Sequence, residues 1–408
     1  MSGATPPPVR VLIVAGEASG DLYGGLLMRE MSAVPARGDT PVAFGTGGIE
    51  FIGVGGPAMR AAGLRPLADA SALGVTGVLE VLGRIASIWA AYRSAGAALE
   101  DPRGRPDLAI LIDYPDFNLR LAARARRAGV PVLYFISPQV WAWRPGRVRR
   151  MAGIVDRVMV ILPFEEAIYR RAGVPVEFVG HPLLDLVRIQ RSRSQERAAL
   201  GLNPGSPVLA LLPGSRRNEM RAHLRPMLEA ASRLKDEFRD LQCLLTVAPT
   251  FDRKEVEDQV AAAIPARGAR PVLVFEDRYD AVAAADAAVV ASGTATLETA
   301  LLGVPMVVVY RMNPMTYLLA RRLMHLEDIG MPNLIAGRRV VPELVQKDCT
   351  GKAIAAQVRR LLTDPGAAER MRRDLGEVRE RLGSHGAIAR VARGAWSMIH
   401  AARGARVA

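Results

Sequence analysis

The chain has 408 residues, half of them apolar and 23% charged, a composition typical of globular proteins and unlike that of disordered or disulfide-rich chains. At roughly 150 residues per domain the length exceeds one hydrophobic core, and we expect two domains. The 54 Lys and Arg residues outnumber the 41 Asp and Glu residues by 13, and nearly all are arginines, which favours an anionic partner such as a phosphate or a lipid headgroup; because no nucleic-acid-binding motif accompanies them, we expect no nucleic-acid partner.

The N-terminus has no basic segment followed by an apolar core and a small-residue cleavage site, so we expect no signal peptide and a cytoplasmic protein. The longest stretch without a charged residue, Ala198–Ser215, has 18 residues and three prolines. It is too short for a membrane-spanning helix of about 20 residues. The two cysteines, Cys243 and Cys349, are too few for a metal-ligand set.

Short apolar runs rich in Val and Ile alternate with helical segments along most of the chain. Because these runs are continuous, they predict parallel strands covered by helices on both faces, the doubly wound α/β pattern. The predicted strands are Val9–Val14, Leu108–Ile112, Val132–Ile136, Val158–Ile161, Val176–Val179, Val208–Leu212, Cys243–Val247, Val272–Phe275, Ala287–Ala291 and Met306–Val309.

The predicted strands fall into two groups, separated by the charged and small residues of Asp185–Pro207. We therefore expect a Rossmann-like N-terminal domain over residues 1–187 and a second Rossmann-like domain over residues 188–345, facing each other across a cleft.

No strand is expected after about Pro342. Residues 346–408 are predicted to be helical, because apolar residues recur there at helical spacing. The clearest set is Ile388, Val391, Ala395 and Ile399.

The first strand runs into the glycine-containing segment Gly16–Asp21, and a helix is expected from about Leu22. Glycine beside a strand end lets a ligand approach the backbone, and a helix N-terminus favours an anion. The spacing is not that of a dinucleotide fingerprint, and a tight turn capped by Ser19 or Asp21 explains the segment equally well. Gly53–Pro57 predicts a second glycine-rich turn.

Leu73–Tyr92 reads as an amphipathic helix. A face packed on the core is the favoured interpretation, and contact with lipid is the alternative. The apolar stripe comprises Val78, Val81, Leu82, Ile85, Ile88, Trp89 and Tyr92.

Two carboxylates, Asp113 and Asp116, follow the strand Leu108–Ile112, at the end where doubly wound sheets bind ligands. A carboxylate within hydrogen-bond reach of an alcohol can accept its proton as a new bond forms, and partial desolvation would raise its pKa toward neutrality. For Asp116, capping of a turn is the favoured interpretation.

Two tryptophans, Trp141 and Trp143, lie beside Arg144 and a basic helix. Aromatic rings stack on sugars and arginines pair with phosphate, but a buried tryptophan pair next to a solvated helix is an equal alternative. His181, after another strand, could orient a phosphate or sugar hydroxyl or could be structural.

Two glycine turns in the second half follow strands and precede helices. Gly214, Ser215 and Arg216 form one, and Ser292, Gly293 and Thr294 form the other. Backbone N–H groups at such helix starts bind diphosphates, arginine pairs with phosphate, and Glu298 could accept hydrogen bonds from a ribose diol. A nucleotide site is therefore favoured over two ordinary turns.

Motifs for other chemistries are missing. The chain has no D-x-D pair, P-loop, H-E-x-x-H or G-x-S-x-G motif. We therefore expect no metal and no other cofactor, and expect arginine and helix N-termini to stabilise the leaving-group charge.

Nine blocks in order over about residues 11–345 resemble the lipid-A-disaccharide synthase family: VAGEASGD, LGVTGVLEVLGR, IDYPDFN, SPQVWAWR, LPFE with VGHPLLD, LLPGSR, ASGTATLE, VVYRMNP and MPNLIAGR. The resemblance implies an inverting, metal-independent GT-B glycosyltransferase. It would move 2,3-diacylglucosamine from its UDP conjugate to the 6-hydroxyl of 2,3-diacylglucosamine 1-phosphate, releasing UDP and a β-1,6-linked disaccharide 1-phosphate, at the cytoplasmic face of the Gram-negative inner membrane.

The resemblance also implies roles for residues. Asp113 would be the general base, with Glu17 as a second catalytic residue. The acceptor side would include Ser19, Asp116, Trp141, Arg144 and His181. The UDP side would include Gly214, Ser215, Arg216, Ser292, Gly293, Thr294, Glu298 and Asn333.

The family resemblance further implies a homodimer. Residues 346–408 would pack back on the N-terminal domain or be exchanged between the two chains. Two other functions stay open on the sequence: another GT-B enzyme that uses a UDP-sugar, such as a sugar 2-epimerase or the peptidoglycan glucosaminyltransferase, and a binding protein that transfers nothing.

Overall fold

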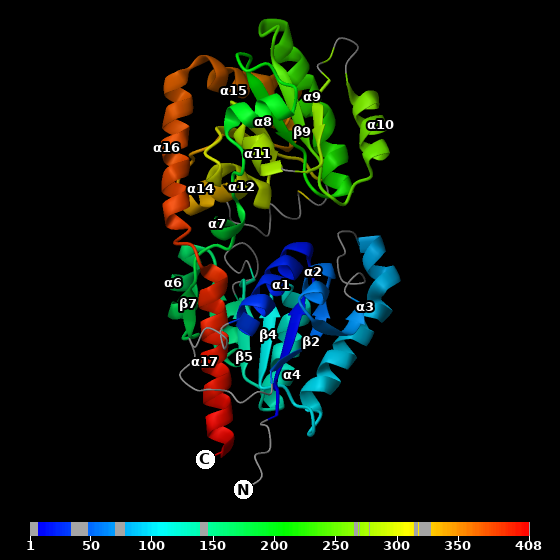
Figure 1. Cartoon of the computed structure of the whole chain (residues 1–408), viewed down its shortest axis with the longest axis vertical. Helices are drawn as coiled ribbons and strands as arrows, with labels where there is room; N and C mark the ends of the chain where they lie inside the picture. The colour runs from blue at the N-terminus through cyan, green and yellow to red at the C-terminus, as the bar shows by residue number, and fades with distance from the viewer. Residues whose placement is uncertain are drawn as a thin grey trace. The chain divides into compact units, whose positions relative to one another are not determined.

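The computed structural model describes residues 7–33, 48–69, 78–138, 146–264, 268, 270–276, 278–313, 317 and 328–407. The chain divides into two compact units. One comprises Met1–Pro182 with Ser384–Ala408, and the other comprises Leu183–Gly383 (Figure 1). None of the helices in the described ranges is long and apolar enough to cross a membrane.

The first unit is built on a sheet of seven parallel strands in the order β3-β2-β1-β4-β5-β6-β7. The strands are β1 (Val9–Ala15), β2 (Ile49–Gly55), β3 (Leu64–Asp69), β4 (Leu108–Ile112), β5 (Val132–Phe135), β6 (Arg157–Val160) and β7 (Val176–Phe178).

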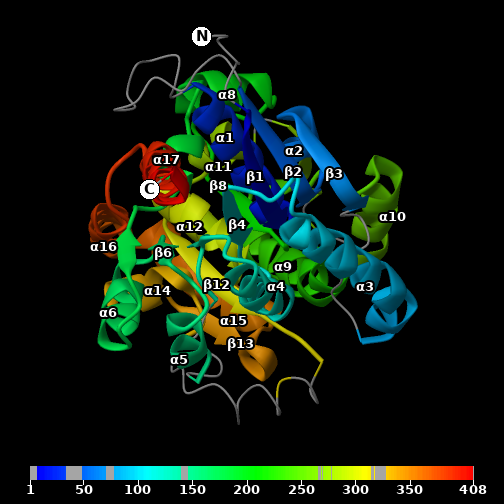
Figure 2. The same ribbon diagram turned by 90° about the horizontal axis from the view of Figure 1, so that it is seen from below.

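Helices cover both faces of this sheet. Leu12 and Val14 of β1 face a core that includes residues of α3 and α4, while Val11 and Ile13 are equally buried on the other face, where α1 and α17 contact the strands (Figure 2). This burial explains the continuous apolar runs. The helices are α1 (Ala18–Ala33), α2 (Pro57–Ala61), α3 (Val78–Glu100), α4 (Pro115–Arg127), α5 (Gly146–Ala152), α6 (Pro163–Arg171) and α17 (Ala387–Val407).

The second unit has a six-stranded parallel sheet in the order β10-β9-β8-β11-β12-β13. Its strands are β8 (Val208–Leu212), β9 (Gln242–Thr246), β10 (Val272–Val274), β11 (Ala287–Ala291), β12 (Met306–Tyr310) and β13 (Glu343–Val345). Its helices are α7 (Leu183–Leu186), α8 (Arg193–Ala199), α9 (Arg217–Glu237), α10 (Arg253–Ala263), α11 (Arg278–Ala283), α12 (Thr294–Leu301), α14 (Met331–Ala336), the 3-10 helix η3 (Gln346–Asp348), α15 (Gly351–Thr363) and α16 (Pro365–Arg381). The α/β class of two Rossmann-like domains is thus confirmed.

Three strands, β2, β3 and β13, were not expected from the sequence. The prediction that no strand follows Pro342 is wrong, because β13 pairs with β12. Gly53 and Gly55 belong to β2 and not to a turn. A Cβ atom on Gly53 would lie 1.9 Å from the carbonyl oxygen of Ile13 on the neighbouring strand, so glycine is needed there for close backbone approach.

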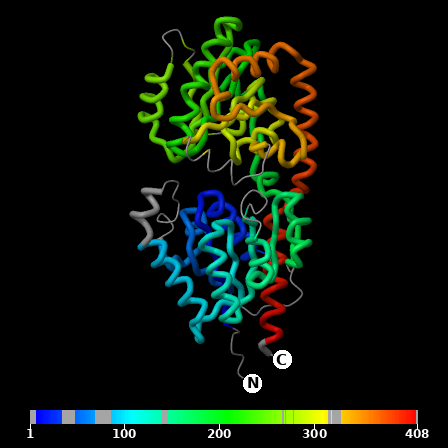
Figure 3. Tube along the Cα trace, turned by 180° about the vertical axis from the view of Figure 1, so that it is seen from behind, coloured from blue at the N-terminus to red at the C-terminus, as the bar shows by residue number. Residues whose placement is uncertain are grey.

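The C-terminal segment is divided between the two units. Residues 346–383 belong to the second unit, whereas α17 packs on α1 of the first unit. The buried Trp396 indole N–H donates to the carbonyl of Met31 at 3.1 Å, and Arg403 pairs with Asp107 at 2.7 Å. In Figure 3 the terminal helix lies alongside the strands and helices of this unit. Exchange of this segment between two chains stays a prediction.

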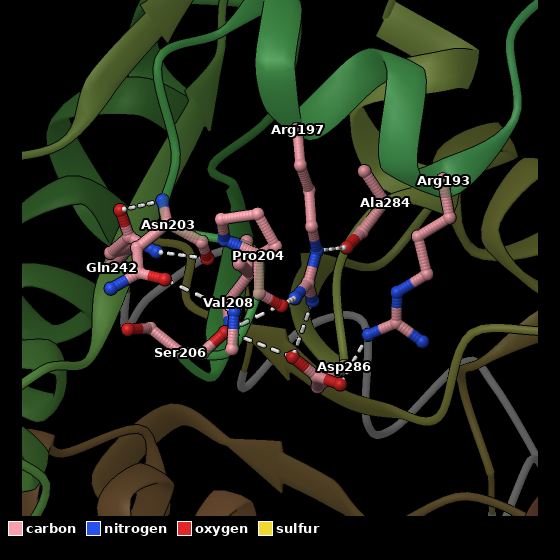
Figure 4. A network of polar contacts seen from close by, with 10 residues as sticks. Arg193, Arg197, Asn203, Pro204, Ser206, Val208, Gln242, Ala284 and Asp286 are labelled. Carbon is pink, nitrogen blue, oxygen red and sulfur yellow. Dashed lines mark hydrogen bonds and ion pairs between the residues drawn. The ribbon is translucent and has the colours of Figure 1, made fainter.

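The segment after Pro182 belongs to the second unit because polar contacts anchor it there. The buried Arg197 of α8 donates to the carbonyls of Ala284, Pro204 and Ser206 and to Asp286 at 2.8–3.2 Å (Figure 4). Asp286 also accepts the N–H of Val208, the first residue of β8, at 2.8 Å. Helix α7 contacts α12 of the same unit, so the unit begins at Leu183, before the expected residue 188.

Candidate functional site

The first sheet reverses its strand order between β1 and β4, which are neighbours in the middle of the sheet. At such a point the loops after the two strands run in opposite directions and leave a crevice for ligands. Ala15 and Ile112, the last residues of these strands, are register partners. Glu17 and Asp113 therefore follow adjacent strand ends.

The backbone at Asp113 is strained. Asp113 and Tyr114 have φ values of 48° and 45°, in the left-handed region, and such a conformation costs about 1–3 kcal/mol for a non-glycine residue. Pro115, which begins α4, disfavours the right-handed helical alternative at Tyr114. The ring of Tyr114 then lies over Gly16, where a Cβ atom would be 2.5 Å from the ring carbon Cγ. Gly16 is thus required for the two motifs to meet.

The Asp113 carboxyl lies in an environment that disfavours its charge. Burial raises its pKa to about 6, with a further contribution from the negative charge of Glu17, whereas a hydrogen bond from the Tyr114 backbone acts in the opposite direction. At neutral pH the group is ionised, yet it is a stronger proton acceptor than an ordinary aspartate. That combination suits a general base.

The other residues expected near Asp113 have varied surroundings. Ser19 lies exposed at the start of α1. Asp21 accepts the N–H groups of Gly56, Ala58 and Met59 at 2.7–3.1 Å, so it caps α2 and not its own turn.

Asp116 is exposed in the first turn of α4 and pairs with Arg147 of α5 at 2.5 Å, so it is not the cap of that helix. His181 is buried after β7, the edge strand that β5 and β6 separate from β4. Burial lowers its pKa to about 4, which keeps it neutral. Trp141 and Arg144 lie outside the described residues.

The second sheet has the same kind of reversal between β8 and β11. Leu212 and Val290 are register partners near the ends of these strands, so Gly214, Ser215 and Arg216 follow one strand while Ser292 and Gly293 follow the other. The two glycine turns predicted to bind a nucleotide therefore lie at adjacent strand ends in one unit.

The turn before α9 is already occupied by a carboxylate. Glu219 accepts the N–H groups of Ser215 and Arg216 at 3.0 and 3.2 Å, as in a capping box. Gly214 has a φ of 116°, and a Cβ atom there would lie 2.5 Å from Glu219 Oε2. The N–H groups expected to bind phosphate are therefore engaged, and the guanidinium of Arg216, which is 47% exposed, lies 3.8 Å from the same Glu219 carboxylate.

The turn before α12 differs. Gly293 is the N-cap, and no acidic residue occupies the first turn of the helix. Among the described residues, no hydrogen-bond acceptor contacts the N–H groups of Thr294 and Ala295. The Ser292 hydroxyl donates to the carbonyl of Ile329 at 3.0 Å, which holds the turn. This helix start has the N–H groups and dipole that favour an anion.

Glu298 lies one turn into α12, with a side chain only 14% exposed. Its Oε1 accepts hydrogen bonds from Arg278 and Tyr279, each at 3.0 Å. The ion pair keeps the carboxylate in place, and its second oxygen has no such contact among the described side chains. Arg278 and Tyr279 gave no signal in the sequence, because only the fold brings α11 beside α12.

The side-chain amide of Asn333 is hydrogen-bonded within the protein. The side chain is 1% exposed, its Nδ2 donates to Val341 and Glu343, and its Oδ1 accepts the N–H groups of Val340 and Val341, all at 2.7–2.9 Å. In this arrangement every hydrogen-bonding position of the amide is used within the protein, and its direct contact with the nucleotide stays a prediction.

His223 is a further residue that the sequence did not single out. It is fully buried, and its Nε2 accepts the N–H of Arg311 at 2.8 Å while its Nδ1 contacts the carbonyl of Pro213 at 2.9 Å. Because Nε2 accepts a hydrogen bond, the ring proton lies on Nδ1, which donates to the Pro213 carbonyl. Burial lowers the pKa of His223, so the ring stays neutral. His223 thereby connects the chain after β8 with the chain after β12.

A family model described as lipid-A-disaccharide synthetase matches residues 11–389. Lipid-A-disaccharide synthase from Geobacter metallireducens is 45% identical over 388 residues, covering 95% of this chain and 97% of the relative. The enzyme of the same name from Geobacter sulfurreducens is 46% identical over 384 residues, covering 94% and 95%.

Solved structures share the fold at low sequence identity. CalG4, a calicheamicin glycosyltransferase, has a TM-score of 0.58 at 17% identity and covers 99% of this chain and 100% of its own. MurG from Acinetobacter baumannii has a TM-score of 0.55 at 15% identity, covering 96% and 100%. The architecture is GT-B, and the chain belongs to the lipid-A-disaccharide synthase family of glycosyltransferases.

Proposed function

We propose that this enzyme transfers 2,3-diacylglucosamine from UDP-2,3-diacylglucosamine to the 6-hydroxyl of 2,3-diacylglucosamine 1-phosphate, with inversion, and that Asp113 accepts the hydroxyl proton. The observation that carries the assignment is the raised pKa of Asp113 at the β1/β4 reversal. As the acceptor oxygen bonds to the anomeric carbon, the bond to UDP breaks and the proton passes to Asp113.

The second unit would bind UDP. The open N-terminus of α12 and the Arg216 guanidinium supply positive potential for the diphosphate, and Glu298 would accept hydrogen bonds from the ribose. These groups would stabilise the leaving-group charge as it forms, and we propose that transfer needs no metal.

The pH dependence of turnover should follow the ionisation of the Asp113 carboxyl group. Because Asp113 must be ionised to accept a proton and its pKa is about 6, we expect kcat/KM to be constant above about pH 7 and to fall tenfold per pH unit well below 6. Initial rates between pH 4.5 and 8.5 would check this. A profile that is flat down to pH 4.5 would contradict the assignment.

We also propose that the enzyme associates peripherally with the inner face of the inner membrane. Trp89 on α3 is a large apolar side chain with 55% of its surface exposed, and the net charge of +13 favours anionic lipid surfaces. Other apolar residues of the predicted stripe, from Val78 to Ile85, lie where side chains are outside the described part.

Replacing Trp89 with serine should reduce co-sedimentation with anionic vesicles severalfold and leave the melting temperature nearly unchanged. Ile189→Ser is a matched control, since Ile189 in the second unit is also 55% exposed. Equal vesicle binding by both variants and the parent would rule out a role of Trp89 in lipid contact.

The substrate assignment is tested by donor choice. UDP release should require both donor and acceptor, and acylated UDP-glucosamine should be used far better than UDP-N-acetylglucosamine. Release of UDP without an acceptor would favour a UDP-sugar hydrolase or epimerase, and no release with any donor would favour a binding protein.

A further inference from the structure

Two buried side chains converge on the backbone carbonyl oxygen of Asp113. The Tyr134 hydroxyl donates to it at 2.5 Å, and the Asn118 Nδ2 donates to it at 2.7 Å. Tyr134 comes from β5, the strand that pairs with β4, and Asn118 comes from α4, the helix that follows β4 in the chain. The carbonyl of the strained residue is therefore held from two directions.

Both donors are fixed in their roles. Tyr134 is fully buried, and burial raises its pKa well above the ordinary value, so the hydroxyl keeps its proton. Asn118 is also fully buried, and its Nδ2 makes a second hydrogen bond, to the carbonyl of Ile112 at 3.1 Å. Both amide protons are thus used on consecutive carbonyls at the end of β4.

The side-chain amide of Asn118 satisfies its donors but not its acceptor. Its buried Oδ1 has no hydrogen-bond partner among the described residues, and an unpaired buried acceptor destabilises a fold. An unsatisfied buried group in a native protein requires an explanation, and a functional site is one place where such groups are expected. In this orientation the Asn118 Nδ2 group keeps its hydrogen bonds to the carbonyls of Ile112 and Asp113.

We infer that Tyr134 and Asn118 are positioning residues, which hold Asp113 in its left-handed conformation and so fix the direction of the carboxylate. Relaxation of φ and ψ at Asp113 would turn both its carbonyl and its Cβ, because the two are attached to the same Cα. The inference rests on the proposed role of Asp113 as the base. A proton acceptor displaced by about 1 Å can lose a hundredfold in rate.

The main test is Tyr134→Phe, which removes one hydroxyl and no ring atom. We expect kcat to fall about 10- to 100-fold, with the KM values for donor and acceptor within about twofold of the parent. Tyr169→Phe is the matched control, because Tyr169 lies in the same core and its hydroxyl contacts the Met151 sulfur, at 3.6 Å, and Ser137, with no described contact to Asp113. The control should retain parental kcat.

The Asp113→Asn background separates positioning from a general structural effect. If Tyr134 acts through the Asp113 carboxylate, Tyr134→Phe should cause less than a twofold further loss in the residual activity of Asp113→Asn. Asn118→Ala should behave in the same way, and the two losses should not multiply in the double variant, since both hold one carbonyl.

Three outcomes would overturn the inference: a kcat of Tyr134→Phe within twofold of the parent, an equal fold-loss in both backgrounds, or the same loss in Tyr169→Phe. None of them bears on whether Asp113 is the base. That proposal fails separately, if Asp113→Asn retains near-parental turnover.

Discussion

Replacing Asp113 with asparagine should lower turnover by about 10²- to 10⁴-fold, the usual contribution of a positioned general base, while UDP binding stays within about twofold of the parent. The substitution keeps the volume of the side chain and removes its capacity to accept a proton. Asparagine also tolerates the left-handed backbone at this position. Steady-state rates and UDP titration by calorimetry would measure the two effects.

The stability of this variant provides an internal control. The pKa of Asp113 is raised in the folded state to about 6, so the folded chain binds the proton more tightly than the unfolded chain, and the free energy of unfolding falls as pH rises from about 4 to 6. Above pH 6 the ionised carboxylate destabilises the fold. Asp113→Asn should therefore melt no lower than the parent at pH 8, and a melting temperature well below it would mean that lost activity reflects misfolding.

Replacing Arg197 with methionine should destabilise the second unit by about 3 kcal/mol, because it leaves Asp286 without its buried partner and removes donors from three backbone carbonyls. Methionine retains most of the apolar stem, so the loss reports on the guanidinium. Urea unfolding of the full chain, followed by probes in each unit, would show the second transition shifted to lower concentration.

Arg193→Met is the matched control. Arg193 pairs with the other oxygen of the same Asp286, but its side chain is 45% exposed whereas that of Arg197 is 7% exposed. Exposed ion pairs stabilise by at most about 1 kcal/mol. Equal unfolding midpoints for the two variants would show that burial of Arg197 has no energetic consequence.

All the central strands except β2 could be predicted from the sequence, as could the edge strands β7 and β10, whereas the edge strands β3 and β13 could not. β1, β4, β8 and β11 are buried on both faces and are continuous apolar runs. β3 is an edge strand that contains Pro66 and pairs with a register shift, and β13 is an edge strand of three half-buried residues. A strand with one free edge needs neither continuous apolar residues nor every N–H group, so its sequence carries little signal.

The parts of the candidate site that directly follow a strand could be predicted from the sequence. Asp113 and the turns near Gly214 and Gly293 follow strand ends, which a pattern of apolar runs locates. The occupied turn at Glu219 and the satisfied amide of Asn333 were not foreseen, because each depends on which partner a side chain selects after folding. Glu219 did carry a signal, since a glutamate three residues after a helix N-cap is the capping-box pattern.

Long-range contacts account for what the sequence could not give. Tyr134 reaches Asp113 across 21 residues, and His223 reaches Arg311 across 88. A buried tyrosine in a strand or a histidine in a helix looks like ordinary core in the sequence. Only the strand order brings these polar atoms to the backbone that they hold.

The most direct measurement is the product balance of the purified enzyme, supplied with UDP-2,3-diacylglucosamine and 2,3-diacylglucosamine 1-phosphate. We predict one UDP and one disaccharide 1-phosphate formed per donor consumed, by chromatography and mass spectrometry, with both products lost together in Asp113→Asn. Disaccharide formed at the parental rate by Asp113→Asn, or UDP formed by the parent without disaccharide, would contradict the account.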